Sequence, residues 1–397
     1  MDVRDALHKA LDDERFPGPA LLAQAMSRLD APSHSSGLRW APMMAAILTF
    51  ALVSTLVVAR FSSSILQPAP GAGACASSAG APAQVGPQPP RAAGAMAYDD
   101  ATKQVVLFGG TEIGAQTALN DTWIWNGKGW SKDLSTLKPP PRMEAAMAYD
   151  GSTHQLLLFG GVDADGTPYA DTWSWDGAAW HELHPATSPP PRRDAAIAYD
   201  DDLQAIVMFG GWNPVIGGAA KLNDTWTWNG SSWTRLNPAT VPPKRGSAVM
   251  GYHAGTHRIV MFGGDVGNHT NETWTFDGRD WMLVEVHGSA PSPRTATNLA
   301  RDDATGTLIL FGGEAPTTGI FVGPHNDTWT WDGTGWTQRQ SACAPPSRGT
   351  YTFAGQMAYD SALNVVVLNG GYNGQTPRML GDTWTWDGTT WTPAPSS

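Results

Sequence analysis

Residues 326–336 read NDTWTWDGTGW and place Trp329, Trp331 and Trp336 close together in a chain that holds 19 tryptophans among its 397 residues. Stretches of the same pattern recur roughly every 50 residues. Their first residues are Asn120, Ala170, Asn223, Asn271, Asn326 and Gly381. A pattern that returns at a near-constant period predicts a repeat architecture, in which each copy is one structural unit.

Two further signatures accompany each tryptophan stretch. A run of apolar residues that ends in a glycine pair comes before it, as in LILFGG at 308–313. A proline-rich run closed by an arginine comes before that glycine pair. The arginines are Arg91, Arg142, Arg192, Arg245, Arg294 and Arg348. Three signatures in a fixed order therefore predict six equivalent units.

One copy predicts four short strands, which we name A to D. In the fifth copy they fall at 294–300, at 308–311, at 328–331 and around Trp336. The turn between strands C and D is Asn-Gly or Asp-Gly in every copy, here Asp332–Gly333, and this is the strongest short signal for a β-hairpin. Four-stranded antiparallel units at this period are typical of propeller blades.

The chain resembles the kelch-repeat family of β-propellers, and is similar to its Trp-rich bacterial membrane-protein members. The resemblance rests on the apolar run with Gly-Gly, the Asp-x-Trp and the final Trp of each copy, over 89–395. Trp at the W-x-W positions replaces the tyrosine that usually follows the glycine pair in the family. The resemblance implies an all-β fold, a six-bladed kelch-like β-propeller over 89–397, in which no strand is borrowed from the other terminus.

The tryptophans of strand C lie on one face, because side chains alternate along a strand. Trp329 and Trp331 share that face, and Thr328 and Thr330 share the other. Each indole buries roughly 150–250 Å² of surface, and blades that meet face to face need large flat side chains between them. We therefore expect the repeated tryptophans to form the core between blades rather than a ligand site.

The repeated arginine and aspartate should lie side by side. Strands alternate in direction, so the start of A, the end of B and the start of C meet at one edge of the blade. We expect structural Arg–carboxylate clamps there, with a ligand-facing ring of arginines around the central channel as the alternative. The residues concerned include Arg142, Arg192, Arg245, Asp121, Asp171, Asp224, Asp327 and Asp382, with Glu272 in the fourth copy.

A ligand site is predicted on the face that carries the B–C and D–A loops. The B–C loops differ in every copy, and variable loops on a rigid scaffold are the usual seat of binding. Aromatic and scattered polar side chains on these loops suit a protein or glycan ligand, although some of them could simply cap the ends of blades. The candidate ligand-binding residues are Trp212, Tyr372, Tyr169, Phe321, His325 and Arg378.

We expect no enzymatic activity, no catalytic residue, no metal site and no cofactor. Kelch-type copper oxidases need a Tyr–Cys link with histidine ligands, and the only cysteine of the predicted propeller, Cys343, lies in a D–A loop. The sialidase motif S-x-D-x-G-x-T-W has one residue between Asp and Gly, whereas Asp directly precedes Gly here, as at Asp332–Gly333. Charged residues make up 15% of the chain and the net charge is −11, which argues against a nucleic-acid partner. A hydrolase or oxidase with its site on the variable face stays open as an alternative.

The first part of the chain predicts a membrane anchor. Residues 41–59 carry no charge and are long enough to cross a bilayer, so we expect a transmembrane helix over 40–60 that contacts membrane lipid. Arg28 and Arg39 against Arg60 favour a cytoplasmic N-terminal segment, 1–39, with short helices. A linker rich in Pro, Gly and Ala follows over 61–88. A cleaved signal peptide is the rival interpretation.

Together these features predict a single-pass cell-membrane protein that displays a monomeric propeller outside the cytoplasm as a binding module. A receptor that signals through its N-terminal tail is a further alternative. Cys75 and Cys343 are the only cysteines and would share the oxidising side, where a disulfide between them is possible. Unpaired thiols and pairing between chains are the alternatives, which peptide mapping without reduction would distinguish.

Overall fold

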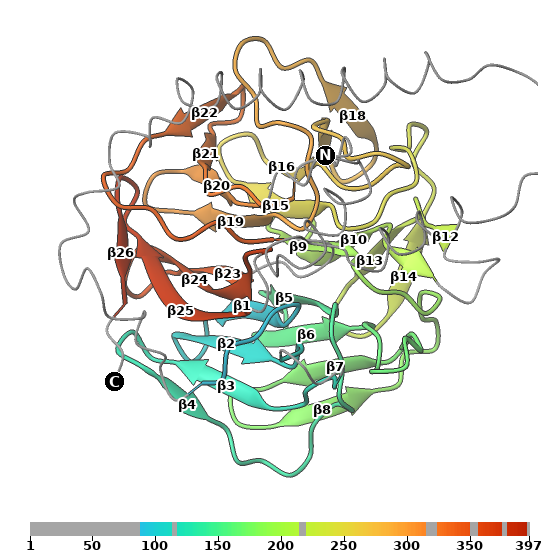
Figure 1. Ribbon diagram of the computed structural model, residues 1–397. Helices are drawn as coiled ribbons and strands as arrows, with labels where there is room; N and C mark the ends of the chain where they lie inside the picture. Colours follow the sequence, from blue (N-terminus) through green and yellow to red (C-terminus); the bar gives the residue numbers. More distant parts are fainter. Residues whose placement is uncertain are drawn as a thin grey trace, which may run out of the picture. The chain divides into compact units, whose positions relative to one another are not determined.

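The fold is a ring of six β-sheets around a common centre (Figure 1). The computed structural model describes residues 88–112, 117–213, 220–314, 324–349, 356–374 and 379–394. Over these residues the chain forms six four-stranded antiparallel sheets and one two-stranded ribbon. The predicted all-β six-bladed propeller is confirmed.

Each blade runs from strand A at the centre to strand D at the rim. The A strands are β1 (Ala95–Asp99), β5 (Ala146–Asp150), β9 (Ala196–Asp200), β15 (Val249–His253), β19 (Asn298–Asp302) and β23 (Gln356–Asp360). The B strands are β2 (Gln104–Phe108), β6 (Gln155–Phe159), β10 (Ala205–Phe209), β16 (Arg258–Phe262), β20 (Thr307–Phe311) and β24 (Val365–Tyr372). The C strands are β3 (Thr122–Trp125), β7 (Thr172–Trp175), β13 (Thr225–Trp228), β17 (Thr273–Phe276), β21 (Thr328–Trp331) and β25 (Met379–Trp386). The D strands are β4 (Trp130–Lys132), β8 (Trp180–Leu183), β14 (Trp233–Leu236), β18 (Trp281–Val284), β22 (Trp336–Arg339) and β26 (Trp391–Pro393).

The ring closes without an exchanged strand, as predicted. Each described four-stranded sheet takes its strands in chain order, and the third blade adds the ribbon of β11 (Trp212–Asn213) and β12 (Ala220–Lys221) between its B and C strands. The sixth blade then lies against the first. Gly371 N donates to Arg91 O at 2.8 Å and Trp130 Nε1 donates to Thr383 Oγ1 at 2.9 Å, so ordinary contacts between neighbouring blades join the two ends of the ring.

The C–D hairpins form for the reason that their sequence predicts. Asp332 Oδ1 accepts hydrogen bonds from Thr334 N at 2.8 Å and Gly335 N at 3.0 Å, which replaces backbone partners inside the turn. Gly333 has a φ of 95°, which glycine adopts without strain. A Cβ at this position would also lie 2.7 Å from the His253 ring of the preceding blade. The turn therefore serves both the hairpin and the packing between blades.

The tryptophans fill the spaces between blades, which confirms the assignment made from the W-x-W pattern. Trp173, Trp175 and Trp180 of the second blade pack against Val106 and Phe108 of the first, and the rings of Phe108 and Trp180 meet edge-on with centroids 5.1 Å apart. In every blade the described strand C and D tryptophans are between 0% and 7% exposed, and Phe276 holds the one position without a tryptophan. The blades are therefore joined mainly by aromatic packing.

A ring of side-chain hydrogen bonds runs through this aromatic core. The tryptophan that opens strand D donates its Nε1 proton to the threonine directly before the first aromatic residue of strand C in the preceding blade. This bond satisfies an indole that has left water. The pairs are Trp130–Thr383, Trp180–Thr122, Trp233–Thr172, Trp281–Thr225, Trp336–Thr273 and Trp391–Thr328, with distances from 2.8 to 3.0 Å.

The predicted N-terminal segment 1–39, transmembrane helix 40–60 and nearly all of the linker 61–88 lie outside the described residues. In the ranges that the structure describes, no helix is long and apolar enough to cross a membrane. The anchor and its orientation therefore stay predictions.

Candidate functional site

The repeated arginine, glycine pair and carboxylate meet at one edge of each blade. In the third blade, Arg192 donates to Asp224 through two hydrogen bonds of 2.8 Å and to Gly210 O at 3.0 Å. Arg192 is 1% exposed. The same contacts join Arg91–Asp121, Arg142–Asp171, Arg294–Asp327 and Arg348–Asp382, while Arg245 makes a single bond to Glu272.

Most donors of the Arg192 guanidinium are taken up within its own blade. Its Nε donates to Pro190 O at 3.0 Å, so four of its five N–H groups have partners. Burial alone would raise the pKa of Asp224, but the hydrogen bonds and charge of Arg192 outweigh burial and lower that pKa. This geometry favours a clamp over a ligand-facing ring, and the choice between the two roles stays a prediction.

The predicted loop-face residues are spread over separate blades. Tyr169 and His325 hold equivalent positions in the second and fifth blades, because each donates its backbone N–H to the second glycine of the pair at 2.8 Å. The Arg142 guanidinium carbon lies 4.1 Å from the centroid of the Tyr169 ring. Burial and the charge of Arg294 lower the pKa of His325. Tyr372 ends β24 in the sixth blade, where its carbonyl accepts from Gly349 N at 2.9 Å. Phe321 and Arg378 lie outside the described residues.

Trp212 is half-buried rather than a free surface ring. It opens the β11–β12 ribbon, where Lys221 Nζ lies 4.7 Å and the Arg193 guanidinium carbon 6.0 Å from its ring centroid. A Cβ at Gly246 of the fourth blade would lie 1.9 Å from Nε1, so the bare glycine makes room for the indole. The buried indole N–H has no hydrogen-bond partner among the described residues.

Acidic groups pair with the two cations that lie beside this indole. Lys221 Nζ pairs with Asp265 Oδ1 at 2.6 Å, and Arg193 pairs with Glu144 and with Asp194. Burial, followed by the charge of Glu144, raises the pKa of Asp194 well above its ordinary value. We call this group the Trp212 cluster; its members are Trp212, Arg193, Lys221, Glu144, Asp194 and Asp265.

One cavity lies at the end of the central channel that carries the A–B turns, opposite the B–C and D–A loops. It has a volume of about 400 Å³ and is lined by residues of the A strands and A–B turns of all six blades. A second cavity of about 180 Å³ lies nearer the loop face, and apolar residues such as Met96, Ile197 and Met250 line both. The two cavities therefore share part of their lining along the channel.

Comparison with known proteins agrees with this architecture. A family model described as the KLHDC2/KLHL20/DRC7 Kelch-repeats domain matches residues 101–280, from the first A–B turn to the fourth C–D turn. The fifth and sixth blades repeat the same signatures. The chain belongs to the kelch-repeat propellers. No curated protein matches it.

The cavity of about 400 Å³ in this kelch propeller was not predicted from the sequence. Its wall includes the residue one before the last of each A strand, which is Tyr98, Tyr149, Tyr199, Tyr252, Arg301 and Tyr359. Ala-Tyr-Asp recurs at this position in most copies, and the fifth copy reads Ala-Arg-Asp. That repeated tripeptide, with its one change from tyrosine to arginine, was the available signal.

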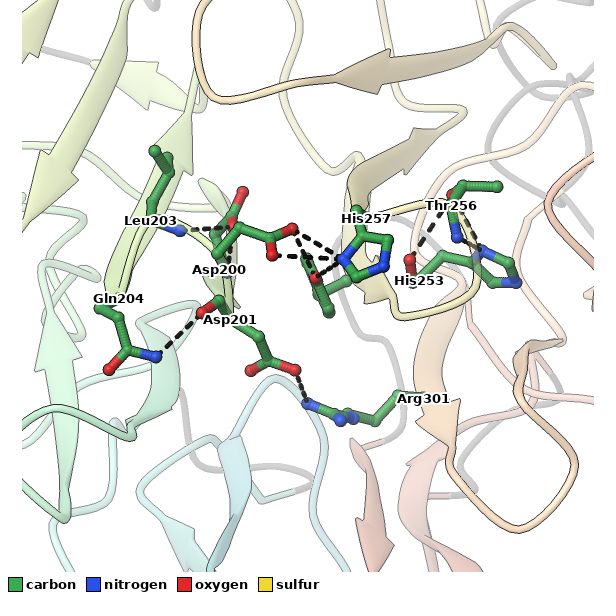
Figure 2. A network of polar contacts seen from close by, with 10 residues as sticks. Asp200, Asp201, Leu203, Gln204, His253, Thr256, His257 and Arg301 are labelled. Carbon is green, nitrogen blue, oxygen red and sulfur yellow. Dashed lines mark hydrogen bonds and ion pairs between the residues drawn. The ribbon is translucent and has the colours of Figure 1, made fainter.

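Polar contacts link these residues at the mouth of the channel. Arg301 Nη1 reaches Asp201 Oδ2 of the third blade at 3.4 Å (Figure 2). Its Nε donates to Asp303 Oδ1 at 2.7 Å. Tyr252 donates its hydroxyl to Asp202 Oδ2 at 2.8 Å, and His257 Nδ1 lies 3.2 Å from the same carboxylate. The A–B turns are therefore tied to one another around the opening.

Of the two cysteines, Cys75 and Cys343, the structure describes only Cys343. Cys343 is buried between the fifth and sixth blades and is disulfide-bonded. Cys75 lies outside the described residues, so the pairing of these two cysteines stays a prediction.

Proposed function

We propose that this kelch propeller is a binding module that takes a protein or glycan ligand on its B–C and D–A loop face. Kelch propellers generally serve as protein-interaction modules, and the Trp212 cluster is the observation that carries this proposal for the present chain. A half-buried indole beside two cations, which themselves pair with carboxylates, brings an aromatic ring and charged hydrogen-bonding groups together in one place. Tryptophan and arginine are the residue types most enriched at binding hot spots.

We propose that residues 40–60 anchor the protein in the cell membrane as a single span, with 1–39 in the cytoplasm and the propeller outside. The uncharged run 41–59 between Arg39 and Arg60 supports this arrangement. Protease added to intact cells should then digest the propeller or its linker and spare a tag at the N-terminus. Protection of the whole chain would contradict the orientation.

Replacement of Trp212 by alanine should weaken capture of a ligand on the loop face by roughly 30-fold or more, the effect of losing a hot-spot tryptophan. The full-length protein would be screened on glycan arrays and by pull-down, and each ligand found would be titrated against Trp212→Ala and Tyr372→Ala. Lys103→Ala, an exposed change on the A–B turn face, is the matched control and should bind as the parent does. Unchanged affinity of every ligand for both aromatic variants, with their Tm retained, would show that the loop face is not the binding face.

A further inference from the structure

The cavity at the A–B turn end of the channel combines aromatic walls with negative charge. Five of the six blades contribute a tyrosine to the wall. Tyr252 and Tyr359 are only 4% and 6% exposed, so these rings are fixed by packing rather than free on the surface. With a volume of about 400 Å³, the cavity lies within the range of roughly 300–1,000 Å³ that is common for small-molecule sites.

The charged groups of the wall are mainly carboxylates. Asp100, Asp201 and Asp303 line the cavity, while Arg301 is the one lysine or arginine among the described lining residues. The Arg301 guanidinium is already engaged by Asp201 and Asp303. Asp100 pairs in turn with Lys103 Nζ at 2.6 Å. The three carboxylates are therefore set against two cations, which leaves the cavity with a small excess of negative charge.

Burial and the nearby aspartates raise the pKa of several of these tyrosines. Burial raises the pKa of Tyr149 to about 12, and the charges of Asp100, Asp99 and Asp150 add to the effect. Burial and neighbouring aspartates raise the pKa of Tyr199 and of Tyr359 in the same direction. These phenols therefore stay neutral at physiological pH, and their rings keep the electron-rich faces that attract cations.

We propose that this tyrosine-lined cavity binds a small organic cation, such as a quaternary ammonium group. Aromatic rings and carboxylates around a partly enclosed space stabilise such a cation through its attraction to ring faces and through charge. A metal ion fits less well, because no group of three or more possible ligands is found in the described part of the chain. An anion would face Asp100, Asp201 and Asp303, and the nearby cations Arg301 and Lys103 are already paired with these carboxylates. The site is separate from the loop face, so it goes beyond the function proposed above.

Substitutions of Arg301 test the proposal most directly, because Arg301 lines the cavity and carries a positive charge. It stands where the other blades have tyrosine, and its own charge opposes a second cation. Arg301→Tyr would add a sixth ring and release Asp201 and Asp303, so it should tighten binding of a cation, by roughly three- to tenfold. Arg301→Gln removes the charge without adding a ring and should tighten binding less.

The full-length protein would be titrated calorimetrically with tetramethylammonium and choline, and with tert-butanol as a neutral molecule of similar size. We expect both cations to bind at millimolar concentration or below and tert-butanol to bind far more weakly. Tyr199→Leu and Asp201→Asn should each weaken cation binding by about 2- to 30-fold, the range that a single cation–π or ionic contact spans. Glu182→Gln, an exposed acid of β8, is the matched control and should change nothing.

Three results would overturn the proposal. The first is no binding of either cation at millimolar concentration, and the second is equal binding of tert-butanol. The third is acetate that binds the parent protein and is lost in Arg301→Gln, which would make the cavity an anion site. Retained Tm in each variant shows that a change in affinity reports on the cavity and not on unfolding.

Discussion

Replacement of Trp233 by alanine is expected to destabilise the propeller by about 3–5 kcal/mol, with a fall in Tm on the order of 10 °C. Trp233 is 1% exposed and packs against Phe159 of the preceding blade and Trp228 of its own, with ring centroids 5.2 and 5.4 Å away. Alanine would leave a cavity at the boundary between two blades. It would also leave the Thr172 hydroxyl without its indole donor, which now lies 3.0 Å away. Denaturant unfolding followed by tryptophan fluorescence and by circular dichroism would measure the loss.

Two further variants separate packing from hydrogen bonding at this position. Trp233→Phe keeps a ring but removes the N–H donor, so we expect a smaller loss, with about 1 kcal/mol due to the hydrogen bond. Trp212→Ala is the matched control, because Trp212 is half-buried and lies outside the C and D strands. If Trp233→Ala were no more damaging than Trp212→Ala, the aromatic core between blades would not be what holds the ring together.

The fold could be predicted because its determinants are local and are repeated. The Asn-Gly or Asp-Gly turn fixes each C–D hairpin, and the alternation of Trp and Thr fixes which face of strand C is buried. Copying these local rules six times gives the ring. The partners of Arg192 could be found for a similar reason, since antiparallel strands bring its blade's Gly210 and Asp224 to the same edge.

The chemistry of the two ends of the channel could not be predicted in the same way. The ligand-binding role of Trp212 stays a prediction, but the pairing of β12 with β11, which places Lys221 over its ring, could not be read from the sequence. The tyrosines come from distant parts of the sequence, such as Tyr98 and Tyr359, and line one cavity only after the ring has closed. A comparison of the six copies at this position would have indicated the cavity wall, because five copies have tyrosine there and the fifth has Arg301.

Replacement of Arg192 by methionine should cost about 3–5 kcal/mol, the usual effect of removing one partner from a buried ion pair. The change leaves Asp224, whose side chain is 10% exposed, with a charge that only Trp226 Nε1 still contacts among the described side chains, at 2.7 Å. Arg235→Met, in an exposed position on β14 of the same blade, is the matched control and should lie within the small range of surface substitutions. Thermal and denaturant unfolding would compare the two.

The acid limb of the stability curve gives an independent readout of the same pair. Arg192 lowers the pKa of Asp224, so the stability that the pair contributes is present above the unfolded pKa of roughly 3.9 and is lost as the pH falls through the lower folded value. Arg192→Met should therefore lose less stability in acid than the parent does. The double variant Arg192→Met with Asp224→Asn should recover part of the loss at neutral pH, because the unpaired charge is gone. Unchanged stability in Arg192→Met, together with loss of a ligand that the parent binds, would instead favour the ring of arginines that faces a ligand.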